Sequence, residues 1–156
     1  NGSVTLVSDA QPRIATTLDH IRAVYKELRK VQSEKGYRKL TRLHVHTLAY
    51  QAILTTTDSK WKNSMSAAAK ASLTANRHTC GSTDINIDNA RILMDDAFTT
   101  STQEGKRIHF EEDRPVSCWE EEDFQICLAP VLVCTEVVQT GGGGDNISSA
   151  GLVVQI

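Results

Sequence analysis

Apolar residues recur every three or four positions along several stretches, which is the spacing of one face of an amphipathic helix. The strongest pattern covers Thr16–Lys35 and consists of Leu18, Ile21, Tyr25, Leu28 and Val31. Thr16, with Asp19 three residues later, is expected to cap the start of this helix, and Gly36 is placed to end it. A second helix is expected over Ser59–Asn76, capped by Asp58 or Ser59, and further helices over Asp88–Phe98 and Asn146–Gln155.

Other stretches follow the two-residue period of a β-strand. In Leu40–Leu48, Leu43 and Val45 are expected to face one way and His44 and His46 the other. Glu121–Asp123 fits a hairpin turn between two later strands. The remaining extended segments are expected at Ser3–Val7, Ile85–Ile87, Arg107–Phe110, Val116–Glu120, Phe124–Leu128 and Val131–Cys134. This order of helices and strands favours an α/β layer structure over a β-sandwich.

Charge and composition exclude some classes of partner. The 17 basic and 19 acidic residues give a formal charge of −2, so we expect no nucleic-acid partner and no attraction to an anionic membrane. The apolar runs are shorter than the roughly 18 residues of a membrane span. Methionine occurs only at Met65 and Met94, so we expect Asn1 to be a processed, trimmed or partial start.

Four cysteines, Cys80, Cys118, Cys127 and Cys134, lie at spacings that do not match C-x-x-C. A zinc ribbon or a thioredoxin-type redox site is therefore unsupported. We interpret the four residues as buried thiols. A disulfide remains the alternative, and the redox compartment stays open.

The most informative segment is the run Gly141–Gly144 followed by Asp145, between an apolar strand and an expected helix. Glycine permits positive φ and lets a ligand approach the main chain. Unpaired amides at a helix start bind anions, and an ionised carboxylate beside them can take a proton from an attacking hydroxyl. In-line phosphoryl transfer requires that combination.

A plainer interpretation of the glycine run is a flexible turn, with Asp145 as a helix cap. The run is not a Walker A loop, because no Lys-Ser or Lys-Thr pair follows it, and it does not match G-x-G-x-x-G. The glycines alone do not distinguish a flexible turn from a phosphate-binding loop, so the flanking sequence has to decide between them.

The segment Thr140–Leu152, T-G-G-G-G-D-N-I-S-S-A-G-L, resembles the C-terminal G-x-G-D catalytic segment of the ADP-dependent sugar kinases, above all the eukaryotic ADP-dependent glucokinases. Further matches follow the same order along the chain: R-L-H-V-H-T-L-A-Y at Arg42–Tyr50, I-L-T-T-T-D-S-K-W at Ile53–Trp61, Cys80 with Thr83, and P-V-L-V-C at Pro130–Cys134. The resemblance implies a ribokinase-like α/β fold, a layered sheet with helices, of which residues 1–156 would be the C-terminal part of the large domain.

The same resemblance assigns roles to individual residues. Asp145 would be the catalytic base that deprotonates the 6-hydroxyl of glucose, so that ADP is converted to AMP and glucose to glucose 6-phosphate. Thr140 ends the Val131–Thr140 segment, which would flank the adenine pocket, and is expected to bind the nucleotide. The transferring phosphate would be held by the amides of Gly142, Gly143 and Gly144.

The family uses magnesium, Mg²⁺, to bridge the diphosphate, but its upstream N-x-x-E/D and H-x-E motifs do not occur in this sequence. We assign no metal ligand and expect residues 1–156 to be inactive without the remainder of the enzyme or a larger complex. One alternative is a non-catalytic nucleotide-binding or structural relative that retains the glycine loop. An ATP-dependent ribokinase-type kinase is disfavoured by H-V-H-T-L at His44–Leu48. The resemblance leaves the endoplasmic reticulum and the cytoplasm as compartments.

Three further signals have simpler explanations. His44 and His46 could bind a metal, but we expect strand histidines near a nucleotide. The acidic clusters Glu111–Asp113 and Glu120–Asp123 lack the ligand order of an EF-hand and are interpreted as solvated turns. The glycosylation sequon at Asn146 lies within the proposed site and is expected to stay unmodified.

Overall fold

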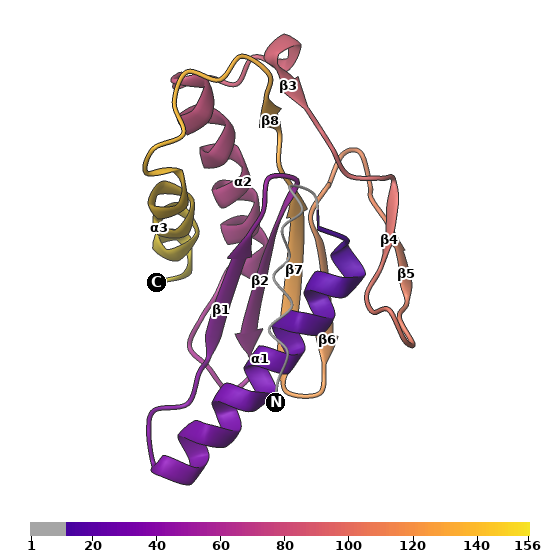
Figure 1. The fold of residues 1–156 in the computed structure, drawn as a ribbon, viewed down its shortest axis with the longest axis vertical. Helices are drawn as coiled ribbons and strands as arrows, with labels where there is room; N and C mark the ends of the chain where they lie inside the picture. The colour runs from indigo at the N-terminus through magenta and orange to yellow at the C-terminus, as the bar shows by residue number, and fades with distance from the viewer. Residues whose placement is uncertain (1–11) are drawn as a thin grey trace.

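A four-stranded antiparallel sheet forms the centre of the protein, and the computed structural model describes residues 12–156 around it. The strand order is β1–β2–β7–β6 (Figure 1), with bounds Arg42–His46, Tyr50–Thr56, Phe124–Pro130 and Ser117–Glu121. Two short ladders lie outside this sheet: β3 (Ala90–Arg91) pairs with β8 (Val133–Cys134), and β4 (Ala97–Thr99) pairs with β5 (Arg107–His109).

Helices cover both faces of the sheet, which makes three layers (Figure 1). Helix α1 (Ile14–Lys35) packs on one face, while α2 (Ser64–Cys80) and α3 (Gly143–Gln155) lie together on the other. The expected mixed α/β layering is therefore confirmed, with a sheet whose pairings are antiparallel throughout. Within residues 12–156, no helix is long and apolar enough to cross a bilayer.

Strand β2 shows why the two helical layers are needed. All seven of its residues are buried, and alternate side chains enter opposite cores. Tyr50, Ala52 and Leu54 join the cluster under α1, whereas Ile53 packs with alanines of α2. In β1, Leu43 and Val45 pack toward the α1 core, and His44 and His46 face the other way, as the alternation predicted.

Helix α1 confirms the predicted apolar stripe over most of its length. Leu18, Ile21 and Tyr25 are buried against the sheet, but Leu28 and Val31 are each 41% exposed because the last turns extend beyond the strands (Figure 1). Gly36 ends the helix with φ 69°, as expected. The predicted cap at Thr16 and Asp19 is wrong. The helix begins at Ile14 without a side-chain cap, and Asp19 instead accepts hydrogen bonds from Thr102.

Two other helix predictions need correction. The helix expected from Ser59 begins at Ser64, with Asn63 as its N-cap residue, so neither Asp58 nor Ser59 caps it. The helix expected over Asp88–Phe98 is absent. A single 3₁₀ turn, η1 (Ile87–Asn89), is followed there by β3 and β4, because pairing of β3 with β8 and of β4 with β5 satisfies the backbone. Consequently Ile85–Ile87 forms no strand.

The later strands agree better with expectation. Hairpin β6–β7 turns at Glu121–Asp123 as predicted, with Glu121 paired to Phe124 across it. The strand expected over Val131–Cys134 is reduced to its last two residues. The extended segment expected at Ser3–Val7 lies outside the described residues.

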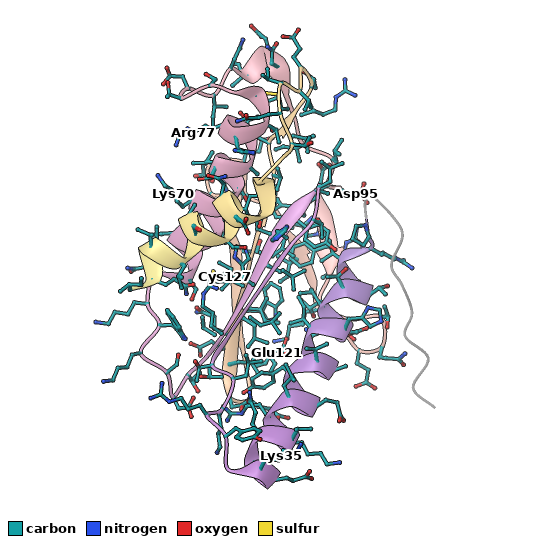
Figure 2. All side chains as sticks on the ribbon, turned by 60° about the vertical axis from the view of Figure 1, so that its left-hand side comes forward. Lys35, Lys70, Arg77, Asp95, Glu121 and Cys127 are labelled. Carbon is teal, nitrogen blue, oxygen red and sulfur yellow. A yellow bond between two sulfur atoms is a disulfide. The ribbon has the colours of Figure 1, made fainter. Side chains whose placement is uncertain are left out.

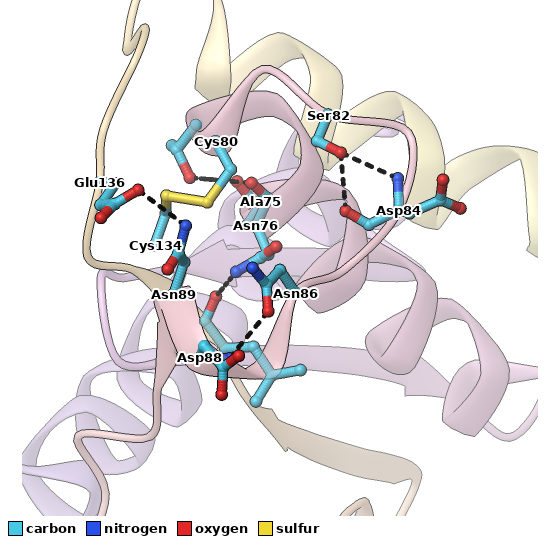
Figure 3. The surroundings of a disulfide bond; sticks show 12 residues. Ala75, Asn76, Cys80, Ser82, Asp84, Asn86, Asp88, Asn89, Cys134 and Glu136 are labelled. Carbon is cyan, nitrogen blue, oxygen red and sulfur yellow. Dashed lines mark hydrogen bonds between the residues drawn. A yellow bond between two sulfur atoms is a disulfide. The ribbon is translucent and has the colours of Figure 1, made fainter.

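The four cysteines form two disulfides, so their interpretation as buried thiols is wrong. Cys118 and Cys127 lie opposite each other in the β6–β7 register, with Cα atoms 4.1 Å apart. Cys80, the last residue of α2, is bonded to Cys134 of β8, 54 residues later (Figure 3). Such pairings depend on strand register and topology rather than on local spacing.

Candidate functional site

The glycine run forms the turn that starts α3. Gly142 is the N-cap residue with φ 72° and ψ 6°, a left-handed conformation that side chains with a Cβ adopt only at a cost. The amide of Gly143 donates to the carbonyl of Thr140 at 3.2 Å, which closes the turn. Gly143, Gly144 and Asp145 then make up the first helical positions. The predicted loop residues are therefore contiguous around one helix terminus.

This terminus presents unpaired amides. The first backbone bond into α3 is donated by Asn146 to the carbonyl of Gly142 at 3.1 Å. No acceptor within residues 12–156 takes the amides of Gly144 and Asp145. Unpaired donors and the positive end of the helix dipole together favour a bound anion.

Asp145 is the one acidic residue in the first turn of α3, and its side chain is exposed. It makes no side-chain cap, since Gly142 occupies the N-cap position. The interpretation of Asp145 as a simple helix cap is therefore wrong. Its carboxylate has no protein hydrogen-bond or ion-pair partner in the part of the chain that the structure describes, and is free to accept a proton.

Histidines lie beneath the glycines of this turn. A Cβ on Gly144 would lie 3.4 Å from Cε1 of His46, and a Cβ on Gly143 would lie 3.7 Å from Cδ2 of His78. These are ordinary van der Waals distances, so the turn packs directly on β1 and on the end of α2. His78 donates from Nε2 to the carbonyl of Gly141 at 2.8 Å. The sequence singled out His46 but missed His78, which belongs to no local pattern.

His44 supports the same helix two turns further along. Burial lowers its pKa to about 4, so its ring is neutral at pH 7. Its Nε2 lies 3.0 Å from Oε1 of Gln51, a fully buried side chain of β2. A Cβ on Gly151 would lie 3.2 Å from Cε1 of His44. A Cβ at this position would make a tight contact, and His44 would have to shift to admit it.

The C-terminal end of α3 is fixed by a polar chain that the sequence did not indicate. Arg42 of β1 donates from Nε to Oε1 of Gln155 at 2.7 Å, and Gln155 donates to Oγ of Ser64 at 3.1 Å. Gln155 is 1% exposed. Figure 2 shows α3 lying alongside both α2 and β1, the elements that supply these contacts. Both ends of α3 are thus attached to the rest of the fold.

The described residues do not form a metal site from three or more protein ligands. No group of three His, Cys, Asp or Glu side chains in residues 12–156 is placed to hold a metal ion. The rings of His44 and His46 are 6.1 Å apart at their centroids, without a third ligand.

The second acidic cluster forms an exposed turn, as expected, but two of its carboxylates also bind residues of α1. Glu121 accepts from Arg22 of α1 through both oxygens, at 2.6 and 2.9 Å, and these contacts with Arg22 help to lower its pKa against the opposing effect of burial. Asp123 accepts from the hydroxyl of Tyr25 at 2.7 Å. These contacts attach the β6–β7 hairpin to α1.

A cavity of about 1070 Å³ lies on the α1 side of the sheet, between the start of α1 and the β4–β5 hairpin. Its lining includes Tyr50, Phe98 and Asp96, but no residue of the glycine turn. The glycine turn lies on the opposite side of the sheet, where α3 packs, so this cavity is not part of the candidate site.

Comparison with known proteins assigns the chain to one protein family. The family model described as the ADP-specific phosphofructokinase/glucokinase conserved region matches residues 1–154. The chain belongs to this family.

Individual relatives come from both branches of that name. An ADP-dependent glucokinase of Bos taurus is 35% identical over 142 residues, which cover 90% of this chain. The solved structure titled last common ancestor of ADP-dependent phosphofructokinases from Methanosarcinales aligns with a TM-score of 0.52 at 19% identity, over 88% of the chain. The aligned region is 28% of the bovine protein and 30% of the ancestral chain.

Proposed function

We propose that this chain carries the phosphate-binding turn and the catalytic base of an ADP-dependent sugar kinase. The main observation in support is the start of α3, where unpaired amides lie next to the exposed carboxylate of Asp145, which has no hydrogen-bond partner within residues 12–156. The amides of Gly142 and Gly144 would hold the terminal phosphate of ADP, and Thr140 would lie beside the nucleotide. The amide of Gly143, which was also expected to bind phosphate, donates to the carbonyl of Thr140 instead. Family membership supports the assignment.

The reaction follows from these roles. Asp145 takes the proton of the sugar hydroxyl as its oxygen attacks the terminal phosphorus of ADP. The bond between that phosphorus and the bridging oxygen breaks, and AMP leaves with the electron pair. The amides of the turn stabilise the charge on the equatorial oxygens of the transferring phosphoryl group. Glucose is the proposed acceptor, giving glucose 6-phosphate.

The chain is also proposed to be the C-terminal part of a larger ribokinase-like domain. Within residues 12–156, strand β1 pairs only with β2, so its other edge is open to a further strand. The relatives are about three times longer than the aligned region, which leaves room for additional strands and for a sugar-binding lid.

A substrate panel tests the proposed function. The native polypeptide that contains these residues is incubated with ADP and glucose, ADP and fructose 6-phosphate, or ATP and glucose. We expect AMP and glucose 6-phosphate from the first pair alone. Turnover of fructose 6-phosphate would move the assignment to the phosphofructokinase branch, and ATP-dependent turnover would contradict the ADP specificity.

The alternative is a nucleotide-binding relative without catalytic activity. It is favoured by the absence of the N-x-x-E/D motif from residues 1–156. Calorimetric binding of ADP without turnover in any of the three mixtures would support it.

We further propose the endoplasmic reticulum, rather than the cytoplasm, as the compartment. All four cysteines form disulfides, Cys80 with Cys134 and Cys118 with Cys127. Disulfides persist in oxidising compartments and are rare in the cytosol. Intact mass of the native protein, alkylated before and after reduction, tests this. Four alkylated thiols without reduction would contradict it.

A further inference from the structure

The last turn of α2 holds the segment that leads into the glycine turn. The carbonyl of Thr79 accepts from the amides of Val138 and Gln139, at 2.8 and 3.3 Å. His78, one residue earlier, donates from its side chain to the carbonyl of Gly141 at 2.8 Å. The imidazole of His78 therefore makes the one of these three contacts that involves a glycine of the turn.

This contact orients a peptide group. The carbonyl of Gly141 and the amide of Gly142 belong to one planar trans peptide, so they point in opposite directions. When the carbonyl points toward His78, the amide of Gly142 must point away from α2. Glycines on both sides of this peptide leave it free to rotate, because neither has a Cβ to restrict it.

We propose that His78 is a positioning residue for the phosphate-binding turn. By fixing the carbonyl of Gly141, it keeps the amide of Gly142 directed outward, where a diphosphate can accept from it. The inference rests on the proposed function for the identity of the anion, but the ordering of the turn by His78 can be measured without any turnover.

Three variants of the native polypeptide separate these effects. His78→Ala removes the donor, and His78→Gln retains an amide donor at a similar reach. His20→Ala, an exposed histidine of α1 on the other face of the sheet, is the matched control. Thermal unfolding of all three is recorded first, to exclude global effects.

Amide hydrogen exchange of the peptide covering Gly141–Ile147 gives the first readout. His78→Ala should exchange faster than wild type, whereas His78→Gln and His20→Ala should match it. Equal exchange in His78→Ala and wild type would overturn the inference, whether or not the protein is a kinase.

Steady-state kinetics give the second readout. Loss of one hydrogen bond should raise the KM for ADP about three- to tenfold in His78→Ala, with kcat changed less than twofold and with recovery in His78→Gln. A wild-type protein without ADP-dependent turnover would contradict the proposed function and leave the exchange result to decide the role of His78. An active enzyme with unchanged KM in His78→Ala would overturn the link to phosphate binding.

Discussion

Replacing Gly151 by alanine tests how closely α3 is packed on β1. In an exposed helix interior, Gly→Ala stabilises by about 1 kcal/mol. Here the new Cβ would lie 3.2 Å from Cε1 of His44 and 3.5 Å from Nη2 of Arg42. His44 cannot rotate away without breaking its contact to Gln51, which is fully buried. Overpacking of this kind costs about 1–3 kcal/mol.

The two effects oppose each other, and the steric effect should be the larger. We expect Gly151→Ala to lower the free energy of unfolding by about 1 kcal/mol, with a net range of roughly 0 to 2 kcal/mol. In a His44→Ala background the obstruction is gone, so the same substitution should stabilise by up to about 1 kcal/mol. The double-mutant cycle would then give a coupling near 2 kcal/mol.

Urea unfolding of the native polypeptide measures these differences, with midpoints compared at constant slope. Ser149 is exposed on the same helix, so the difference between its alanine and glycine variants isolates helix propensity. If Gly151→Ala stabilises as much as alanine over glycine at position 149, then α3 does not rest on His44, and the packing argument fails.

Three further outcomes are expected. Burial lowers the pKa of His44 to about 4, so the free energy of unfolding that it contributes is present above pH 6.5 and is lost as the pH falls toward 4. In His44→Leu, the free energy of unfolding measured in urea should change less over this pH range. Replacing both cysteines of the Cys118–Cys127 disulfide by serine should lower the free energy of unfolding in urea by about 2.5 kcal/mol, the loop-closure entropy for a sequence separation of 9. An unchanged midpoint would mean that the bond does not form. Gly144→Val, placed against His46, should weaken ADP binding in calorimetry more than Asp145→Asn does; equal affinities would argue against a phosphate-binding turn.

Elements with a clear period were predictable from the sequence. Helix α1 and strand β1 each bury one face, so their apolar positions repeat at 3.6 and 2 residues. Strand β2 (Tyr50–Thr56) was missed because both of its faces are buried, and a strand of this kind carries no alternation. Strand β3 was missed because its pairing partner, β8, lies more than 40 residues away.

The candidate site also combines residues that are neighbours in the sequence with contacts between residues that are distant in it. Gly142–Asp145 are neighbours in the chain, so the glycine turn at the start of α3 could be predicted from its own residues. His78 is 63 residues from the carbonyl it contacts, and Arg42 is 113 residues from Gln155. Contacts of this kind arise from the packing of α2 and β1 against α3, which no local pattern encodes.

The central claim, that Asp145 is the base of an ADP-dependent phosphotransfer, is tested most directly by Asp145→Asn in the native polypeptide. The measurement is initial-rate formation of AMP and glucose 6-phosphate from ADP and glucose, with ADP affinity determined in parallel. Loss of a general base should lower kcat by about 10²–10⁴-fold. ADP affinity and thermal stability should stay near those of wild type, because the carboxylate makes no hydrogen bond or ion pair within residues 12–156. Turnover at the wild-type rate would contradict the assignment of Asp145 and, with it, the proposed chemistry of the glycine turn.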